Sequence, residues 1–150
     1  MSADDLTMYE RINIHMEYAV PLVRSLQRIL GEEVVNNALE ERMRQDIAVA
    51  REGPSADVEM SAFASGVEHY AAGDALEYEV LVSDDEYFEM DVTRCAYKET
   101  MEQIEATDIG HLLICNPDFT MAERAGMELT RTQTCMQGAP RCDFRYRKRS

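Results

Sequence analysis

The chain has 150 residues, 45% of them hydrophobic, and carries 29 acidic against 15 basic residues, for a formal net charge of -14. A chain of this length can bury one sizeable core, so we expect a single domain over 1–150, with a helical part over 1–57 and a sheet and cysteine-bearing part over 58–150. The negative charge repels phosphate backbones and anionic membranes, so we expect neither nucleic acid nor a membrane as partner.

The N-terminus and the cysteine content indicate a compartment. No stretch approaches the ~20 apolar residues that span a bilayer, and the acidic start Met1–Asp5 lacks the features of a secretory signal. We therefore expect a cytoplasmic protein. Its four cysteines are then expected to be reduced, which favours buried, catalytic or metal-bound thiols over disulfides.

The first third of the chain predicts two helices. Apolar residues recur at spacings of three and four from Ile12 to Leu30, as one face of a helix requires. Pro21 interrupts this run and is expected to kink the helix or divide it in two, and Gly31 is the expected stop. A second helix is predicted from about Glu32 to Glu52, with an apolar stripe opposite many charges.

The middle of the chain predicts a loop, a short helix and a hairpin. Gly53–Asp57 is a cluster of helix breakers, and Val58–Ala72 is interpreted as a short helix that ends near Gly73. Polar and apolar residues alternate in Leu76–Val82 and again in Tyr87–Thr93, with a polar turn between them. This alternation is typical of a half-buried β-hairpin.

Helical patterns return after this hairpin, from Cys95 to about Ala106, from Ile109 to Cys115 and from Thr120 to Ala125. The segment bends at Asn116, because Pro117 disfavours helical geometry in the residue before it.

A last hairpin is predicted from Met127–Cys135 and Cys142–Arg147. The basic residues Arg145–Arg149 are interpreted as a solvated strand edge rather than a nucleic-acid patch. The order of elements favours an α+β fold, with N-terminal helices and a four-stranded antiparallel sheet of two hairpins packed by intervening helices on one face.

The cysteines of the last third are the first candidates for chemistry. Cys95 ends a predicted strand and opens a predicted helix, where amide groups would favour a thiolate; the alternative is a small buried hydrophobe. Cys115 lies just before a tight bend that also carries Asp118. This carboxylate could act as a general base, orient water, ligate metal or cap the following helix.

Three further residues qualify these candidates. His111 lies one helical turn before Cys115 and could deprotonate it, or it could be an ordinary surface or core histidine. Cys142 and Asp143 are adjacent in a strand and face opposite sides, so they are not expected in one pocket. Cys135, between Thr134 and Met136, lies in no polar motif and is interpreted as core packing.

A zinc site is the alternative to thiol chemistry. Zinc sites in short loops draw their ligands from close pairs, and neither the cysteines nor the three histidines form such pairs here. We therefore expect no metal or cofactor. The alternative is zinc held by Cys95, Cys115 and Cys142, with His111 or a carboxylate as the fourth ligand.

A resemblance to a known family rests on the last third of the chain, from about Asp91 onward. Arg94-Cys95, Cys115-Asn116-Pro117-Asp118, Arg131-Thr132-Gln133-Thr134 and the segment from Gly138 to Tyr146 with Cys142-Asp143-Phe144 resemble the L-2-amino-thiazoline-4-carboxylic acid hydrolases. The similarity is general over the helical half. This resemblance implies a small cytosolic hydrolase that opens a cyclic amidine or amide at a carbon–nitrogen bond. A more distant similarity is to 4-vinyl-reductase-like small-molecule-binding domains.

Three hypotheses follow for function. In the first, Cys115 or Cys95 acts on the small-molecule substrate, Asp118 or His111 moves protons, and Arg94 or Arg131 holds a substrate carboxylate; a metal-bound water is a variant. In the second, the thiols line the pocket of a non-catalytic binding or sensing domain. In the third, the cysteines are structural and the protein binds a partner. The amphipathic N-terminal helices also suggest a homo-oligomer.

Overall fold

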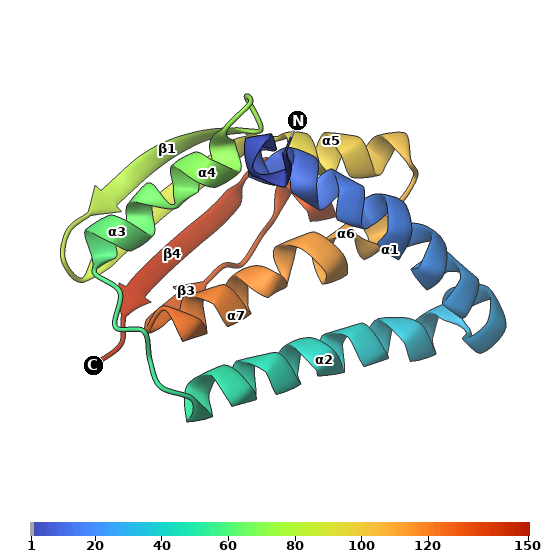
Figure 1. The fold of residues 1–150 in the computed structure, drawn as a ribbon, viewed down its shortest axis with the longest axis horizontal. Coiled ribbons are helices and arrows are strands. Elements are labelled where there is room, and N and C mark those ends of the chain that lie inside the picture. The colour runs from blue at the N-terminus through green and yellow to red at the C-terminus, as the bar shows by residue number, and fades with distance from the viewer. Residues whose placement is uncertain (1) are drawn as a thin grey trace.

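The computed structural model describes residues 2–150 and shows an α+β fold (Figure 1). A four-stranded antiparallel sheet has the strand order β1-β2-β4-β3 within these residues. Its strands are β1 (Leu76–Ser83), β2 (Tyr87–Cys95), β3 (Met127–Thr130) and β4 (Cys142–Lys148). The pairing of β2 with β4 joins the two hairpins into one sheet, which confirms the predicted architecture.

Helices make up the rest of the fold. The 3-10 turn η1 (Ala3–Asp5) precedes α1 (Met8–Leu30) and α2 (Glu32–Glu52), and α3 (Met60–Ser65) and α4 (Val67–Ala71) lead into β1. After β2 come α5 (Ala96–Gln103), α6 (Thr107–Gly110), the π-helical turn η2 (His111–Cys115) and α7 (Pro117–Arg124). A last 3-10 turn, η3 (Cys135–Gln137), lies between β3 and β4. In Figure 1, α3, α4 and α7 lie in front of the sheet.

The two N-terminal helices confirm most of the local prediction. Gly31 separates α1 from α2 with a φ of 91°, a conformation that glycine adopts without a side-chain clash. Pro21 does not divide α1, which runs from Met8 to Leu30. Both Pro21 and Glu17, whose carbonyl loses its helical partner, lie on the exposed side of the helix, where water can replace the missing hydrogen bond.

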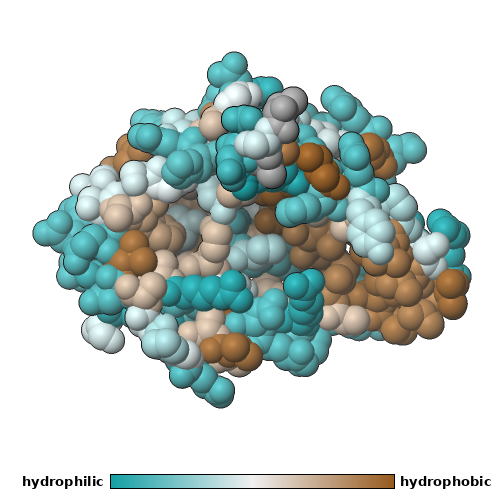
Figure 2. Space-filling view, in the orientation of Figure 1, coloured by the Kyte–Doolittle hydropathy of each residue, from teal (hydrophilic) through white to brown (hydrophobic). Residues whose placement is uncertain are grey.

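An apolar patch remains on the surface where α1 meets α2 (Figure 2). Its residues are Leu26, Ile29, Leu30 and Val34, and Ile29 is 77% exposed. Helix pairing between two copies of the chain stays a prediction. No helix in the part of the chain that the structure describes is both long enough and apolar enough to cross a bilayer.

The second hairpin corrects two predictions. Strand β3 ends at Thr130 instead of Cys135, because the following backbone turns away to donate hydrogen bonds to Asp143. Strand β4 is an inner strand between β2 and β3, so its basic residues do not form a solvated edge. Arg145 instead pairs with Asp91 at 2.8 Å across the sheet.

The region between α6 and α7 also differs from prediction. Asn116 has helical geometry, with φ -64° and ψ -34°, although it precedes Pro117. The backbone at the junction of η2 and α7 is therefore helical, and Pro117 is the first residue of α7, a position that proline favours. Asp118 is accordingly not a cap residue.

The core has two parts with a space between them. One cluster of buried residues joins α1, α5 and α6, and the other fills the region between the inner face of the sheet and helices α3 and α7. Leu76 and Cys95 pack against both clusters. The cavity described next lies at this junction.

Candidate functional site

A cavity of about 360 Å³ lies between the inner face of the sheet and the helices. The sheet contributes residues of β1, β2 and β4, and α3, α4, η2 and α7 contribute the opposite wall. Most of the lining is apolar or aromatic. Ligand sites in proteins have this character, with a few polar groups placed among apolar ones, and this volume is at the lower end of their range.

Alternation in strand β4 supplies much of the sheet wall. Cys142, Phe144 and Tyr146 line the cavity, because alternate residues of a strand share one face. Asp143 does not line it, which confirms that Cys142 and Asp143 do not share a pocket.

The π-helical turn positions the polar part of the opposite wall. The amide of Asn116 donates a hydrogen bond of 2.8 Å to the carbonyl of His111, which closes a wider turn than an α-helix has. Cys115 and Asp118 flank this junction, and both line the cavity. Such π-helical turns are frequent at functional sites.

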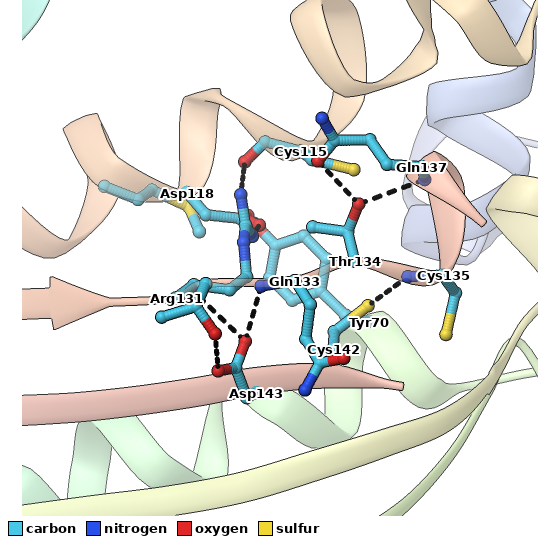
Figure 3. Close-up of polar contacts among 12 residues, drawn as sticks. Tyr70, Cys115, Asp118, Arg131, Gln133, Thr134, Cys135, Gln137, Cys142 and Asp143 are labelled. Atoms are coloured by element: carbon cyan, nitrogen blue, oxygen red, sulfur yellow. Dashed lines mark hydrogen bonds and ion pairs between the residues drawn. The ribbon is translucent and has the colours of Figure 1, made fainter. Parts of the chain in front are cut away.

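An ion pair between Asp118 and Arg131 lies in this wall (Figure 3). Nη1 of Arg131 donates to Oδ2 of Asp118 at 2.6 Å, and Nη2 donates to the carbonyl oxygen of Cys115 at 3.0 Å. The guanidinium lies over the rings of Phe119 and Phe144, 5.0 Å from each centroid. The Arg131 side chain is only 3% exposed, whereas that of Asp118 is 23% exposed.

Asp143 accepts hydrogen bonds from the loop that follows Arg131 and holds this loop in place. The amides of Thr132 and Gln133 each donate to Oδ1 of Asp143 at 2.9 Å, and the hydroxyl of Thr132 donates to Oδ2. Burial raises the pKa of Asp143, but these hydrogen bonds together lower it by more, so the pKa lies below its usual value. Asp143 is therefore an ionised anchor that positions Arg131, a role that sequence reasoning missed.

The same loop also packs closely against helix α6. A Cβ atom on Gly110 would lie 2.4 Å from the sulfur of Met136, so any larger residue at this position would displace the Met136 side chain. The amide of Cys135 donates to the sulfur of Cys142 at 3.1 Å. Cys135 itself is buried, as expected of a packing residue.

Burial sets the electrostatics of Asp118. Loss of water raises the pKa of this carboxyl to about 6, against the charge and the hydrogen bond of Arg131, which lower it. A carboxyl that titrates near neutral pH and faces a cavity is suited to proton transfer.

The three candidate thiols meet at this cavity but are not activated. Cys95, Cys115 and Cys142 all line it, as the sequence suggested. Burial raises the pKa of each thiol, and at Cys95 it outweighs the amides of Lys98 and Tyr97, which lower the pKa. The expectation that helix amides favour a Cys95 thiolate is therefore wrong, because desolvation is the larger effect.

Two predicted site residues lie elsewhere. Arg94 is not among the lining residues, and its guanidinium donates to both carboxylate oxygens of Glu99 and to the carbonyl of Asp74. His111 also lies outside the lining, and its carbonyl takes part in the π-helical turn. Among residues 2–150, no group of three or more His, Cys, Asp or Glu side chains is arranged to hold a metal ion.

Tyrosines complete the polar part of the lining, and sequence reasoning did not single them out. The Tyr70 hydroxyl donates to the sulfur of Met121 at 3.0 Å, and the Tyr97 hydroxyl donates to the carbonyl of Tyr70 at 2.9 Å. Tyr146 is buried against Phe63 and Phe144. For Tyr146, the alternation of the last strand was the available signal.

Comparisons with known proteins assign the chain to a family. None of the curated proteins matches it. Among the solved structures that do is the phenol-responsive sensory domain of the transcription activator PoxR with phenol, at 12% sequence identity and a TM-score of 0.47, over 85% of this chain and 71% of that one. The sequence profile of the L-2-amino-thiazoline-4-carboxylic acid hydrolases matches residues 11–146, nearly the whole chain. The chain therefore belongs to the L-2-amino-thiazoline-4-carboxylic acid hydrolase family.

Proposed function

We propose that the protein binds a small cyclic amidine or amide in this cavity and hydrolyses one of its carbon–nitrogen bonds. The observation that carries the proposal is the placement of Asp118, a carboxyl with a pKa of about 6 that faces an apolar cavity and is oriented by Arg131. Family membership favours hydrolysis as the reaction.

Asp118 would move the proton. The ionised carboxylate accepts a proton from water as the water oxygen bonds to the amidine or amide carbon. Protonated Asp118 then returns this proton to the ring nitrogen as the carbon–nitrogen bond breaks. One water is consumed, the ring opens and the carboxylate is restored. A pKa near the working pH suits both halves of this cycle.

The ion pair leaves Asp118 free for this role. Arg131 occupies Oδ2, and among the hydrogen bonds of residues 2–150 none reaches Oδ1. The exposed part of the carboxylate can therefore meet water or substrate. In this mechanism Cys95, Cys115 and Cys142 stay protonated and shape the cavity instead of attacking the substrate.

The test is turnover of cyclic amidines and amides, followed by mass spectrometry of the ring-opened product. Turnover by the native protein should rise with pH through about 6, because it requires ionised Asp118. Asp118→Asn should lose at least ~100-fold, the usual contribution of a general base. Asp108→Asn is the matched control, because Asp108 also pairs with an arginine, Arg24, but lies outside the cavity. Equal turnover by Asp118→Asn and the native protein would refute the proposed mechanism.

A second candidate is a non-catalytic small-molecule-binding or sensing domain. The protonated state of all three cavity thiols favours it, because the site then contains few reactive groups. Saturable binding of these rings by the native protein, with no ring-opened product at any pH, would support this candidate over hydrolysis.

A further inference from the structure

We infer that the cavity selects a ring whose amidine nitrogens donate hydrogen bonds to Asp118 and which carries no carboxylate substituent. The inference rests on the proposed function and narrows its substrate class. It also separates this chain from the carboxylate-bearing compound for which its family is named.

Arg131 is buried and already paired with a carboxylate, which makes it a poor binding group for a substrate carboxylate. Arginine binds carboxylates best through two parallel N–H donors. Here Nη1 is bound to Asp118 and Nη2 to the carbonyl of Cys115. The guanidinium lies over the rings of Phe119 and Phe144, and the side chain is 3% exposed. With its charge balanced by Asp118 and so little of its side chain exposed, Arg131 is poorly placed to bind a second carboxylate.

No other cationic side chain among the described residues lines the cavity to bind a substrate carboxylate in place of Arg131. Arg131 is the one Lys, Arg or His residue among the described residues that line the cavity. Arg94, the other arginine expected to bind a carboxylate, lies outside the lining and is engaged by Glu99 and Asp74. A substrate carboxylate would therefore be desolvated without a partner, which is costly in an apolar site.

The remaining polar groups favour a donor. Asp118 lines the cavity, and among residues 2–150 no hydrogen bond reaches its Oδ1, so this oxygen can accept one from a ligand. Its negative charge repels an anion and attracts an amidinium. The apolar and aromatic lining accommodates the ring itself. Asp118 is the more exposed member of the ion pair, at 23% against 3% for Arg131, so the charge that a ligand meets points to a neutral or cationic ligand.

Titration calorimetry with four matched rings tests the inference at pH 7.5. The rings are 2-amino-2-thiazoline, its 4-carboxylate, the methyl ester of that carboxylate, and 2-methyl-2-thiazoline, which lacks the amino donor. The ester and the unsubstituted aminothiazoline should bind at least ~10-fold more tightly than the carboxylate, because like charges in a buried site cost at least that much. 2-Methyl-2-thiazoline should bind more weakly than 2-amino-2-thiazoline.

The Asp118→Asn variant gives an independent readout. Removal of the negative charge should lower the ester-to-carboxylate affinity ratio by about tenfold or more, whereas Asp108→Asn should leave it unchanged. A carboxylate that binds the native protein as tightly as its ester overturns the inference, even if turnover is observed. Selective binding of the donor rings without turnover upholds the inference and refutes hydrolysis. Failure of all four rings to bind overturns both.

Discussion

Replacement of Asp118 by asparagine should make the protein more stable at pH 8, although it removes an ion pair. The pKa of Asp118 is raised from 3.8 to about 6 in the folded protein, because burial of the carboxylate outweighs the attraction of Arg131. A rise of about two units, at about 1.4 kcal/mol per unit, means that the ionised carboxylate costs the folded state about 3 kcal/mol. Asparagine keeps the shape of the side chain without this charge.

The stability difference between Asp118→Asn and the native protein should depend on pH. Above about pH 6, Asp118 is ionised in both the folded and the unfolded protein, so the full cost is present and the variant should be more stable by about 3 kcal/mol. Below pH 3.8 the carboxyl is protonated in both states and the difference should vanish. For a chain of 150 residues this corresponds to a rise in Tm of roughly 6–12 °C at pH 8.

Urea and thermal unfolding of the two proteins between pH 4 and 8 measure this difference. Asp108→Asn is a control of opposite sign, because two hydrogen bonds from Arg24 lower the pKa of Asp108, so its loss should destabilise the protein at pH 8. If Asp118→Asn were less stable than the native protein at pH 8, the ion pair with Arg131 would outweigh desolvation, and the reasoning would be refuted.

Three further predictions concern the thiols, the arginine and the surface. Single serine variants of Cys95, Cys115 and Cys142 should keep turnover within about threefold of the native protein, and loss of turnover in one variant would restore a thiol mechanism. The thiols of the native protein should react with iodoacetamide at pH 8 more slowly than glutathione does, because burial keeps them protonated. Arg131→Lys should lower the free energy of unfolding by about 2 kcal/mol in urea titrations, because lysine lacks the planar guanidinium that reaches both Asp118 and the Cys115 carbonyl. An unchanged midpoint of urea unfolding would contradict this prediction. In light scattering the native protein should be a homo-oligomer and Ile29→Glu should fall to the 17.1 kDa monomer, with a native monomer as the contrary result.

Local pattern was sufficient for most secondary structure. Helix α2 has the predicted bounds, and the hairpin of β1 and β2 differs from prediction by one or two residues at its ends. Both follow from the spacing of apolar residues, which each segment carries independently of the rest of the chain. Strand β3 was predicted too long because its end depends on hydrogen bonds to Asp143 in another strand.

For the site, the identity of the residues was predictable from the sequence, but their ionisation states were not. Cys95, Cys115, Cys142, Asp118 and Arg131 were recognised in the sequence, and all five line the cavity. Their chemical states were not recognisable, because a pKa depends on burial and on neighbours far apart in the sequence.

Local residue patterns were enough to predict the α+β fold class, the positions of most elements and the set of thiols and charges near the last hairpin. Which charges pair with each other depends on the folded chain, because the partners lie far apart in the sequence or on different elements. The tertiary structure brings Arg131 to Asp118 and leaves Arg94 with Glu99, so each arginine is already paired with a carboxylate of the protein. It also buries the thiols and the Asp118 carboxyl together, and desolvation then keeps the thiols protonated while bringing the carboxyl close to neutral pH.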